Sequence, residues 1–315
     1  MVDNDPFFNA IYILGADSSK ASAIYIYDAT AKSWSTQEVN ANGFDPKSYN
    51  AILDHDTNVF CASSNPLHDL LNDTFLDALS KGELYSLDMG DLKAANSTPV
   101  AWTDVQKPDL GSDYQPVMAL AQNHIHFLDV PGVPSGSAKI FVIHFSYMQP
   151  DSQSYGEFPA THGQATSFFM QQGVQQEFAF IPDDSSATYV LNVETNTTQT
   201  LKGPITKDPM ATYFASTDSL VQLSSSGIVS FLPYTAGTAS ANAAATWSTV
   251  SKLPTAEAPA PPNGTGTVST SGTNTAKGAA ATGGSGSNSG TVGISASVGW
   301  SMGGLVAFAI AALIL

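Results

Sequence analysis

Three histidines have the spacing in this sequence that most suggests metal chemistry. His124 and His126 are two residues apart in a segment with the pattern of a β-strand, so their side chains share one face of that strand. His144 follows the next predicted strand, and three imidazole nitrogens are a known ligand set for zinc. The competing interpretation is polar side chains on the less buried face of a strand, and we favour it. The three histidines are therefore weak candidates, and we expect no metal and no cofactor.

Other reactive side chains lack the partners that catalysis needs. Cys61 is the single cysteine, and its apolar neighbours predict a strand residue rather than a nucleophile or a metal ligand. Residues 54–58 alternate oxygen-bearing side chains but lack the glycine and the distant glutamate of a calcium-binding loop, so they predict a turn. We predict no catalytic residue.

Tryptophans recur at similar places along the chain. Trp34, Trp102 and Trp247 each follow a predicted strand group. Exposed indole rings would provide a surface for stacking sugar rings, whereas buried ones would pack between neighbouring sheets. We favour packing and leave the sugar-binding surface as the alternative.

The charge balance excludes several classes of partner. The formal net charge is −16, and all 11 basic residues are lysines. Bidentate recognition of phosphate or guanine depends on arginine, and an acidic chain repels a phosphate backbone. We therefore expect no nucleic acid partner and no binding to anionic lipid headgroups.

Strand-like segments dominate residues 1–253, which we predict to form one all-β domain. Short runs of β-branched and aromatic residues, each bounded by turn residues, recur throughout this part. The one expected helix spans residues 66–79, where apolar residues have helical spacing. The strands group into five irregular units, which begin near Ile11, Ala51, Val117, Ala165 and Ala211. Units of this size are typical of four-stranded propeller blades. A pair of irregular β-sandwiches is the competing architecture.

The first unit resembles a kelch-type blade. The resemblance rests on Y-I-Y-D-A-T at residues 25–30 together with Trp34, although Gly15-Ala16 stands where kelch blades have two glycines. The chain is similar to cell-surface proteins of filamentous fungi that carry a kelch-like propeller. This resemblance implies six or seven blades, and hence a missing N-terminal piece. The architecture also resembles copper radical oxidases, but the tyrosine and histidine pattern of their copper site is absent.

The C-terminal part of the sequence predicts membrane attachment. Residues 254–297 are rich in Ser, Thr, Gly and Pro and predict a disordered stalk, while residues 298–315 form an uninterrupted apolar tail. Small residues, a spacer and a terminal apolar tail are the layout of a glycosylphosphatidylinositol (GPI) attachment signal, with Asn288 or Ser287 as the expected attachment site. A retained C-terminal helix that spans the membrane is the alternative.

A GPI signal acts only on a secreted chain, yet residues 1–6 do not resemble a signal peptide. Either the natural protein starts before Met1 or the tail is a cytosolic tail anchor. Four N-glycosylation sequons favour the secretory route; they begin at Asn72, Asn96, Asn196 and Asn263. We therefore expect the protein at the cell surface.

These features predict a non-enzymatic surface module that binds a glycan or a protein through one face of the propeller. An extracellular oxidase or hydrolase with a site at the propeller channel is one alternative, and clustered His, Asp or Glu side chains at the channel mouth would favour it. The other alternative is a tail-anchored intracellular adaptor.

Overall fold

The computed structural model describes residues 2–5, 10–15, 17–45, 50–54, 59–63, 83–90, 92–111, 114–170 and 173–251. The expected helix at 66–79, the stalk and the apolar tail lie outside these residues. Within the described part, no helix has the length and apolar character needed to cross a bilayer.

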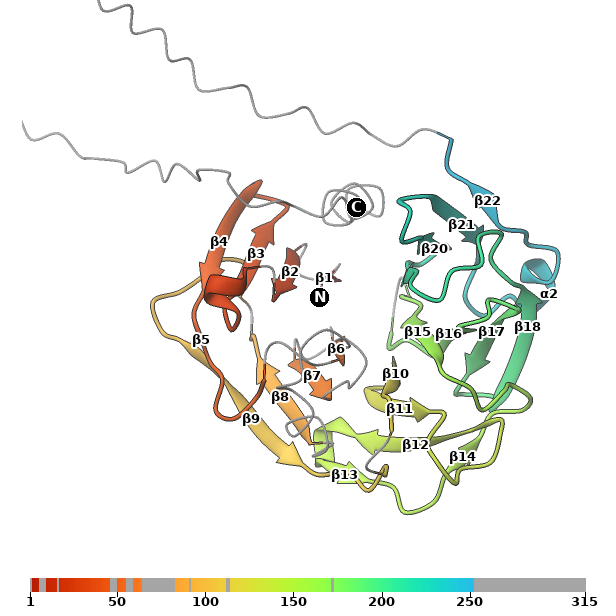
Figure 1. Cartoon of the computed structure of the whole chain (residues 1–315), viewed down its shortest axis with the longest axis horizontal. Coiled ribbons are helices and arrows are strands. Elements are labelled where there is room, and N and C mark those ends of the chain that lie inside the picture. Colours follow the sequence, from red (N-terminus) through yellow and green to blue (C-terminus); the bar gives the residue numbers. More distant parts are fainter. Residues whose placement is uncertain are drawn as a thin grey trace, which may run out of the picture.

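The described chain folds into five β-sheets that succeed one another around a common axis, which is the arrangement of a five-bladed β-propeller (Figure 1). The prediction of an all-β propeller is confirmed. The five sheets match the five units found in the sequence, whereas the kelch resemblance implied six or seven. The innermost strands of successive blades 2 to 5 lie next to one another, which rules out the competing pair of sandwiches.

Each blade is built from consecutive antiparallel strands, with the first strand nearest the axis. Blade 1 contains β1 (Val2–Asp5), β2 (Ala10–Leu14), β3 (Ile24–Asp28) and β4 (Ser33–Gln37). Blade 2 contains β6 (Asn50–Asp54), β7 (Val59–Ser63), β8 (Leu84–Asp88) and β9 (Val100–Gln106), with β5 (Val39–Asn40) added in parallel outside β9. Blade 3 contains β10 (Val117–Ala121), β11 (His124–Leu128) and β12 (Ser137–Val142), with the short β13 (Tyr147–Met148) and β14 (Gln153–Ser154) both paired to β12.

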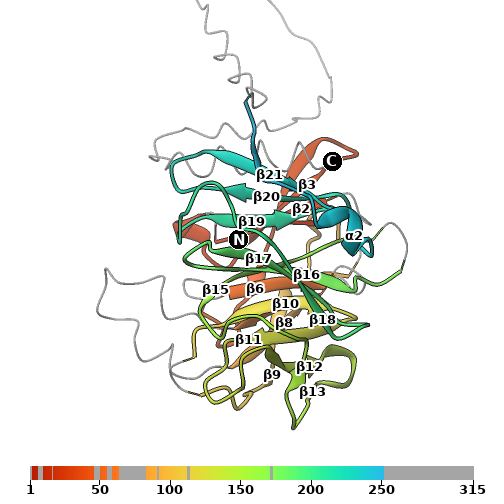
Figure 2. The ribbon, with the colours of Figure 1, turned by 90° about the vertical axis from the view of Figure 1, so that its right-hand side faces the viewer.

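Blades 4 and 5 complete the described ring. Blade 4 contains β15 (Gly163–Ser167), β16 (Glu177–Pro182), β17 (Ala187–Asn192) and β18 (Thr197–Lys202). Blade 5 contains β19 (Thr212–Ala215), β20 (Ser219–Leu223), β21 (Val229–Pro233) and β22 (Ser248–Thr249). Figure 2 shows blades 3, 4 and 5 stacked side by side. Helical structure in the described part is limited to η1 (Ser18–Lys20), η3 (Ile143–Phe145) and α2 (Ala239–Asn242).

Local sequence explains these strands. In β3 the isoleucines at 24 and 26 are buried, while the tyrosines at 25 and 27 lie on the other face and are half-buried. The turn after β3 forms because the Asp28 carboxylate accepts hydrogen bonds from the backbone N–H groups of Thr30 and Ala31. Lys32 then takes a left-handed backbone conformation, which directs the chain into β4.

Aromatic side chains fill the spaces between neighbouring blades. Trp102 is 1% exposed and stacks on Phe44, with ring centroids 4.0 Å apart, in the core shared by blades 1 and 2. Trp247 is 5% exposed between blades 4 and 5, where its indole N–H donates to the Lys202 carbonyl oxygen. Packing is therefore the role of these two tryptophans, whereas Trp34 is 43% exposed and lies against Tyr27.

A buried glutamate joins blade 4 to blade 5. Glu177 begins β16 and is 7% exposed. One carboxylate oxygen accepts a hydrogen bond from the Asn192 amide at 2.8 Å. The other accepts from the Tyr234 hydroxyl at 2.8 Å and from the Gly237 backbone N–H at 3.0 Å. The Tyr234 ring stacks on Phe168, so polar and apolar contacts hold the two blades together at this point.

The propeller has two ends with different loops. One end, which we call the entry face, carries the segments that lead into each innermost strand and the loops that join second to third strands. The opposite face carries the loops that join first to second and third to fourth strands. Loops at the same end of neighbouring blades contact one another. On the opposite face, the N–H of Gln122 in blade 3 donates to the carbonyl oxygen of Gln175 in blade 4.

Candidate binding site

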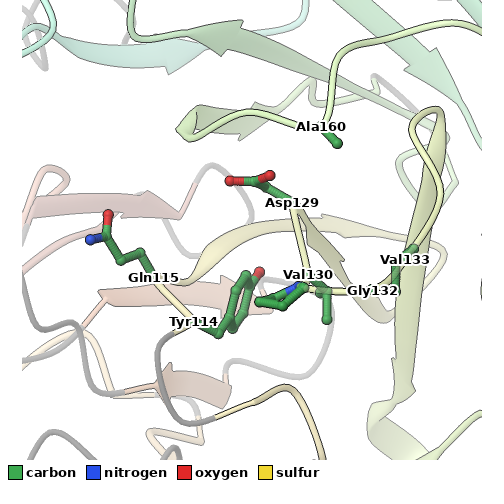
Figure 3. A pocket seen from close by; sticks show the side chains of 8 residues that line it. Tyr114, Gln115, Asp129, Val130, Gly132, Val133 and Ala160 are labelled. Atoms are coloured by element: carbon green, nitrogen blue, oxygen red, sulfur yellow. The ribbon is translucent and has the colours of Figure 1, made fainter.

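A hollow on the entry face of blade 3 combines polar and apolar side chains. Its volume is about 310 Å³, and its polar members are Gln115, just before β10, and Asp129, just after β11. The remaining wall is formed by Tyr114, Val130, Pro131, Gly132, Val133 and Ala160. In the view of Figure 3 the Asp129 carboxylate lies between Gln115 and Ala160.

Tyr114 fixes the geometry of this hollow from below. Its hydroxyl donates to the Leu128 carbonyl oxygen at 2.7 Å and accepts from the Val117 N–H at 3.2 Å. The side chain therefore joins the segment entering β10 to the end of β11, which hold Gln115 and Asp129. Burial raises the pKa of the Tyr114 hydroxyl, so it stays protonated and able to donate.

The backbone around Asp129 aims its side chain out of the strand. Asp129 has φ of 53°, a left-handed conformation that aspartate and asparagine tolerate better than most residues. A tight turn follows, closed by the bond from the Val133 N–H to the Val130 carbonyl oxygen at 3.0 Å. Among the described residues, no side-chain hydrogen bond joins Asp129 or Gln115 to another residue, although the Asp129 carboxylate lies within electrostatic reach of His162 and Asp183.

A histidine–aspartate pair stands beside the hollow. Nδ1 of His162 lies 2.8 Å from an Oδ2 atom of Asp183, and the two side chains are 28% and 42% exposed. His162 directly precedes β15 and Asp183 directly follows β16, so the pairing of these two strands brings the residues together. Burial raises the pKa of Asp129; His162 opposes this rise and the negative charge of Asp183 adds to it.

Of the three histidines singled out from the sequence, His124 and His144 lie at the opposite face of blade 3, whereas His126 lies within β11 and is buried. The rings of His124 and His144 stack with centroids 5.7 Å apart. His126 is 1% exposed and packs between Tyr155 and Phe178, with ring centroids 5.6 and 5.5 Å away. Among the described residues, no group of three or more His, Cys, Asp and Glu side chains has the arrangement to hold a metal ion. The structure thus brings His124 and His144 together. The hypothesis of a three-histidine metal site stays an untested prediction.

Two of the predicted glycosylation sites lie in described loops. Asn96 lies between β8 and β9, and Asn196 lies between β17 and β18; both are exposed and both loops are on the opposite face. The Asn96 side-chain oxygen accepts a hydrogen bond from the Thr98 N–H at 2.8 Å. Asn72, Asn263, Ser287 and Asn288 lie outside the described residues. Cys61 lies in β7, as predicted.

Sequence reasoning missed the four polar residues at and beside the hollow. Gln115, Asp129, His162 and Asp183 belong to four separate loops, so no motif of fixed spacing connects them. The available signal was weak: a polar residue at the end of a buried strand, as Asp129 is after the run His124–Leu128. In comparisons with known proteins, no family model and no curated protein sequence matches this chain.

Proposed function

We propose that this chain is a non-enzymatic binding module whose hollow on the entry face takes a hydroxyl-rich ligand, a residue of a glycan. The observation that carries the proposal is that the Asp129 carboxylate and the Gln115 amide face one hollow without a hydrogen-bonding partner among the described side chains. Loops on a rigid β-scaffold are a common location for binding residues, and a five-bladed propeller suits this role.

The chemistry of the lining fits a sugar ring. Asp129 accepts hydrogen bonds from hydroxyl groups, and Gln115 both donates and accepts. Pro131 and Val133 offer apolar surface to the C–H face of the ring. A volume of about 310 Å³ is at the small end of ligand sites, which suits one sugar residue of a longer chain. A phosphorylated or sulfated ligand is disfavoured, because the net charge is −16 and the site contains a carboxylate.

The proposal includes the location predicted from the sequence. A kelch-like propeller stands on the stalk at 254–297 and is attached through GPI at Asn288 or Ser287. Glycans at Asn96 and Asn196 would lie on the face opposite the hollow, which supports this arrangement because they leave the hollow open.

The ligand is tested by titrating the 315-residue chain, in mild detergent, against a panel of neutral, amino and acidic oligosaccharides. A neutral or amino member should bind. Gln115→Ala should weaken that binding by about 3- to 10-fold, the value of one neutral hydrogen bond. Gln153→Ala is the matched control, because Gln153 lies in β14 at the outer edge of the same blade. Failure of every panel member to bind, or equal loss in the two variants, would contradict the proposal.

The location is tested by expressing the chain with a secretory leader in eukaryotic cells. Asn96→Gln and Asn196→Gln should each remove one glycan from the mass that endoglycosidase releases. Phosphatidylinositol-specific phospholipase C should release the wild-type protein from the cell surface. Protein of unshifted mass that stays in the membrane after the lipase would instead support the tail-anchored adaptor.

A hydrolase is the second candidate, favoured by the His162–Asp183 pair. Asp183 orients the imidazole through Nδ1 and leaves Nε2 to accept a proton from water, the arrangement of a general base. The bound oligosaccharide distinguishes the two functions: a binding module leaves it intact over hours, whereas a hydrolase releases shorter products that disappear in His162→Gln.

A further inference from the structure

The opposite face of blade 3 presents two imidazole rings to solvent at one point. His124 opens β11 and is half-buried, while His144 lies in the turn η3 after β12 and is exposed. The antiparallel register pairs His124 with Val142, two residues before His144, so strand pairing itself sets the distance between the rings. This pair is far along the blade from the hollow, because it lies at the other end of β11 from Asp129.

We propose that His124 and His144 form a two-imidazole binding site for a divalent transition-metal ion, with the remaining coordination positions open to water or to a group from another molecule. This site goes beyond the proposed sugar-binding function and does not depend on it.

The geometry of the rings fits a shared ion. Imidazole nitrogens bind zinc at about 2.0–2.1 Å, and a tetrahedral angle then places two ring centres about 5 Å apart. The observed separation is 5.7 Å, with the ring planes inclined by 29°. The two ring centres are therefore close to the separation that a shared ion requires.

The surroundings hold His144 in place and favour a cation. Phe145 packs against the His144 ring with centroids 4.3 Å apart, and Ser146 closes the turn in a left-handed conformation with its N–H bonded to the Ile143 carbonyl oxygen at 3.0 Å. The net charge of −16 raises the concentration of cations near the surface.

His126 is not part of this site. Its ring centroid lies 6.5 Å from that of His124, and the side chain is enclosed between blades 3 and 4 by Tyr155 and Phe178. Nitrogen ligands select late transition metals over Ca²⁺ and Mg²⁺, so the expected order of affinity places Cu²⁺ first, then Ni²⁺ and Zn²⁺, with Ca²⁺ and Mg²⁺ not bound here.

The test titrates CuSO₄, NiCl₂, ZnCl₂ and CaCl₂ into the 315-residue chain by calorimetry. Loss of even an outer partner of a ligand weakens metal affinity by about 10- to 100-fold, so His124→Gln and His144→Gln should each weaken Cu²⁺ binding by at least that factor. The matched control His162→Gln, on the entry face, should bind Cu²⁺ as the wild type does. His55 and His68 remain in every variant. Metal bound by them would therefore persist in the double variant that carries both His124→Gln and His144→Gln.

Two further measurements use only the wild-type protein, so they do not depend on whether a variant folds. The electron paramagnetic resonance spectrum of the Cu²⁺ complex should show coupling to two imidazole nitrogens. Zn²⁺ should protect His124 and His144, but not His162, from diethyl pyrocarbonate. Unchanged affinity in the double variant, a spectrum with oxygen ligands only, or no protection of the two histidines would overturn the proposal.

Discussion

Replacing Asp129 by asparagine is expected to weaken saccharide binding by about 10- to 100-fold, because hydrogen bonds to a charged acceptor contribute about 1.5–3 kcal/mol. The fold should not suffer. Asparagine tolerates the left-handed backbone at this position, where φ is 53°. Burial raises the pKa of Asp129, so ionisation of this group opposes folding above its unfolded pKa, and removing the charge should leave the free energy of unfolding equal or slightly higher.

Affinity and the urea midpoint measured on the same protein check this prediction, with the exposed Asp151→Asn as control. A pH series adds a second readout. Wild-type affinity should fall as the pH drops through the raised pKa of Asp129, at higher pH than an ordinary aspartate would give. Asp129→Asn should lack this component of the pH dependence. Equal saccharide affinity of the wild type and Asp129→Asn would show that Asp129 does not bind the ligand.

Replacing Glu177 by alanine should lower the free energy of unfolding by about 2–4 kcal/mol. The change leaves the Tyr234 hydroxyl and the Gly237 N–H without their acceptor, and each buried polar group without a partner costs about 1–3 kcal/mol. Glu177→Gln should cost less, because its remaining oxygen still accepts. Urea denaturation measures both variants.

Glu194→Ala is the matched control for this effect, because Glu194 is an exposed glutamate in the same blade. It should change stability by less than about 0.5 kcal/mol, the usual range for surface substitutions. If Glu177→Ala proved as stable as Glu194→Ala, Glu177 would not be the link between blades 4 and 5 that its hydrogen bonds indicate.

The sequence predicts the blades because strand patterns are local. Alternation such as that at residues 24–27 records which face of β3 is buried, and turn residues such as Asp28 mark where the strand ends. Counting such groups in the sequence therefore predicts the five sheets of the described part. The number of six or seven blades came only from the kelch resemblance.

The location of His126 could not be predicted from its own strand. A shared face with His124 suggested a polar, less buried surface, but both faces of a propeller blade pack against neighbours. Phe178 from blade 4 covers His126, and burial lowers its pKa to about 3. His124 is only half-buried, because it lies at the end of the strand.

The candidate site depends on contacts between loops of different blades, which no spacing in the sequence records. Asp129 and His162 are separated along the chain by β12, β13 and β14 of blade 3, and Asp183 joins them only through the pairing of β15 with β16. Gln115 enters because Tyr114 ties its segment to the end of β11. The way in which neighbouring blades pack in the propeller therefore sets the positions of these four side chains.

Hydrogen-exchange mass spectrometry of the chain with and without the saccharide that it binds tests the central claim most directly. Binding in the hollow should slow exchange at residues 114–118, 129–133 and 160–163, and leave the loops around Ser146 and Asn196 on the opposite face unchanged. Slowed exchange confined to the opposite face, or a bound saccharide with no protection at residues 129–133, would contradict the account.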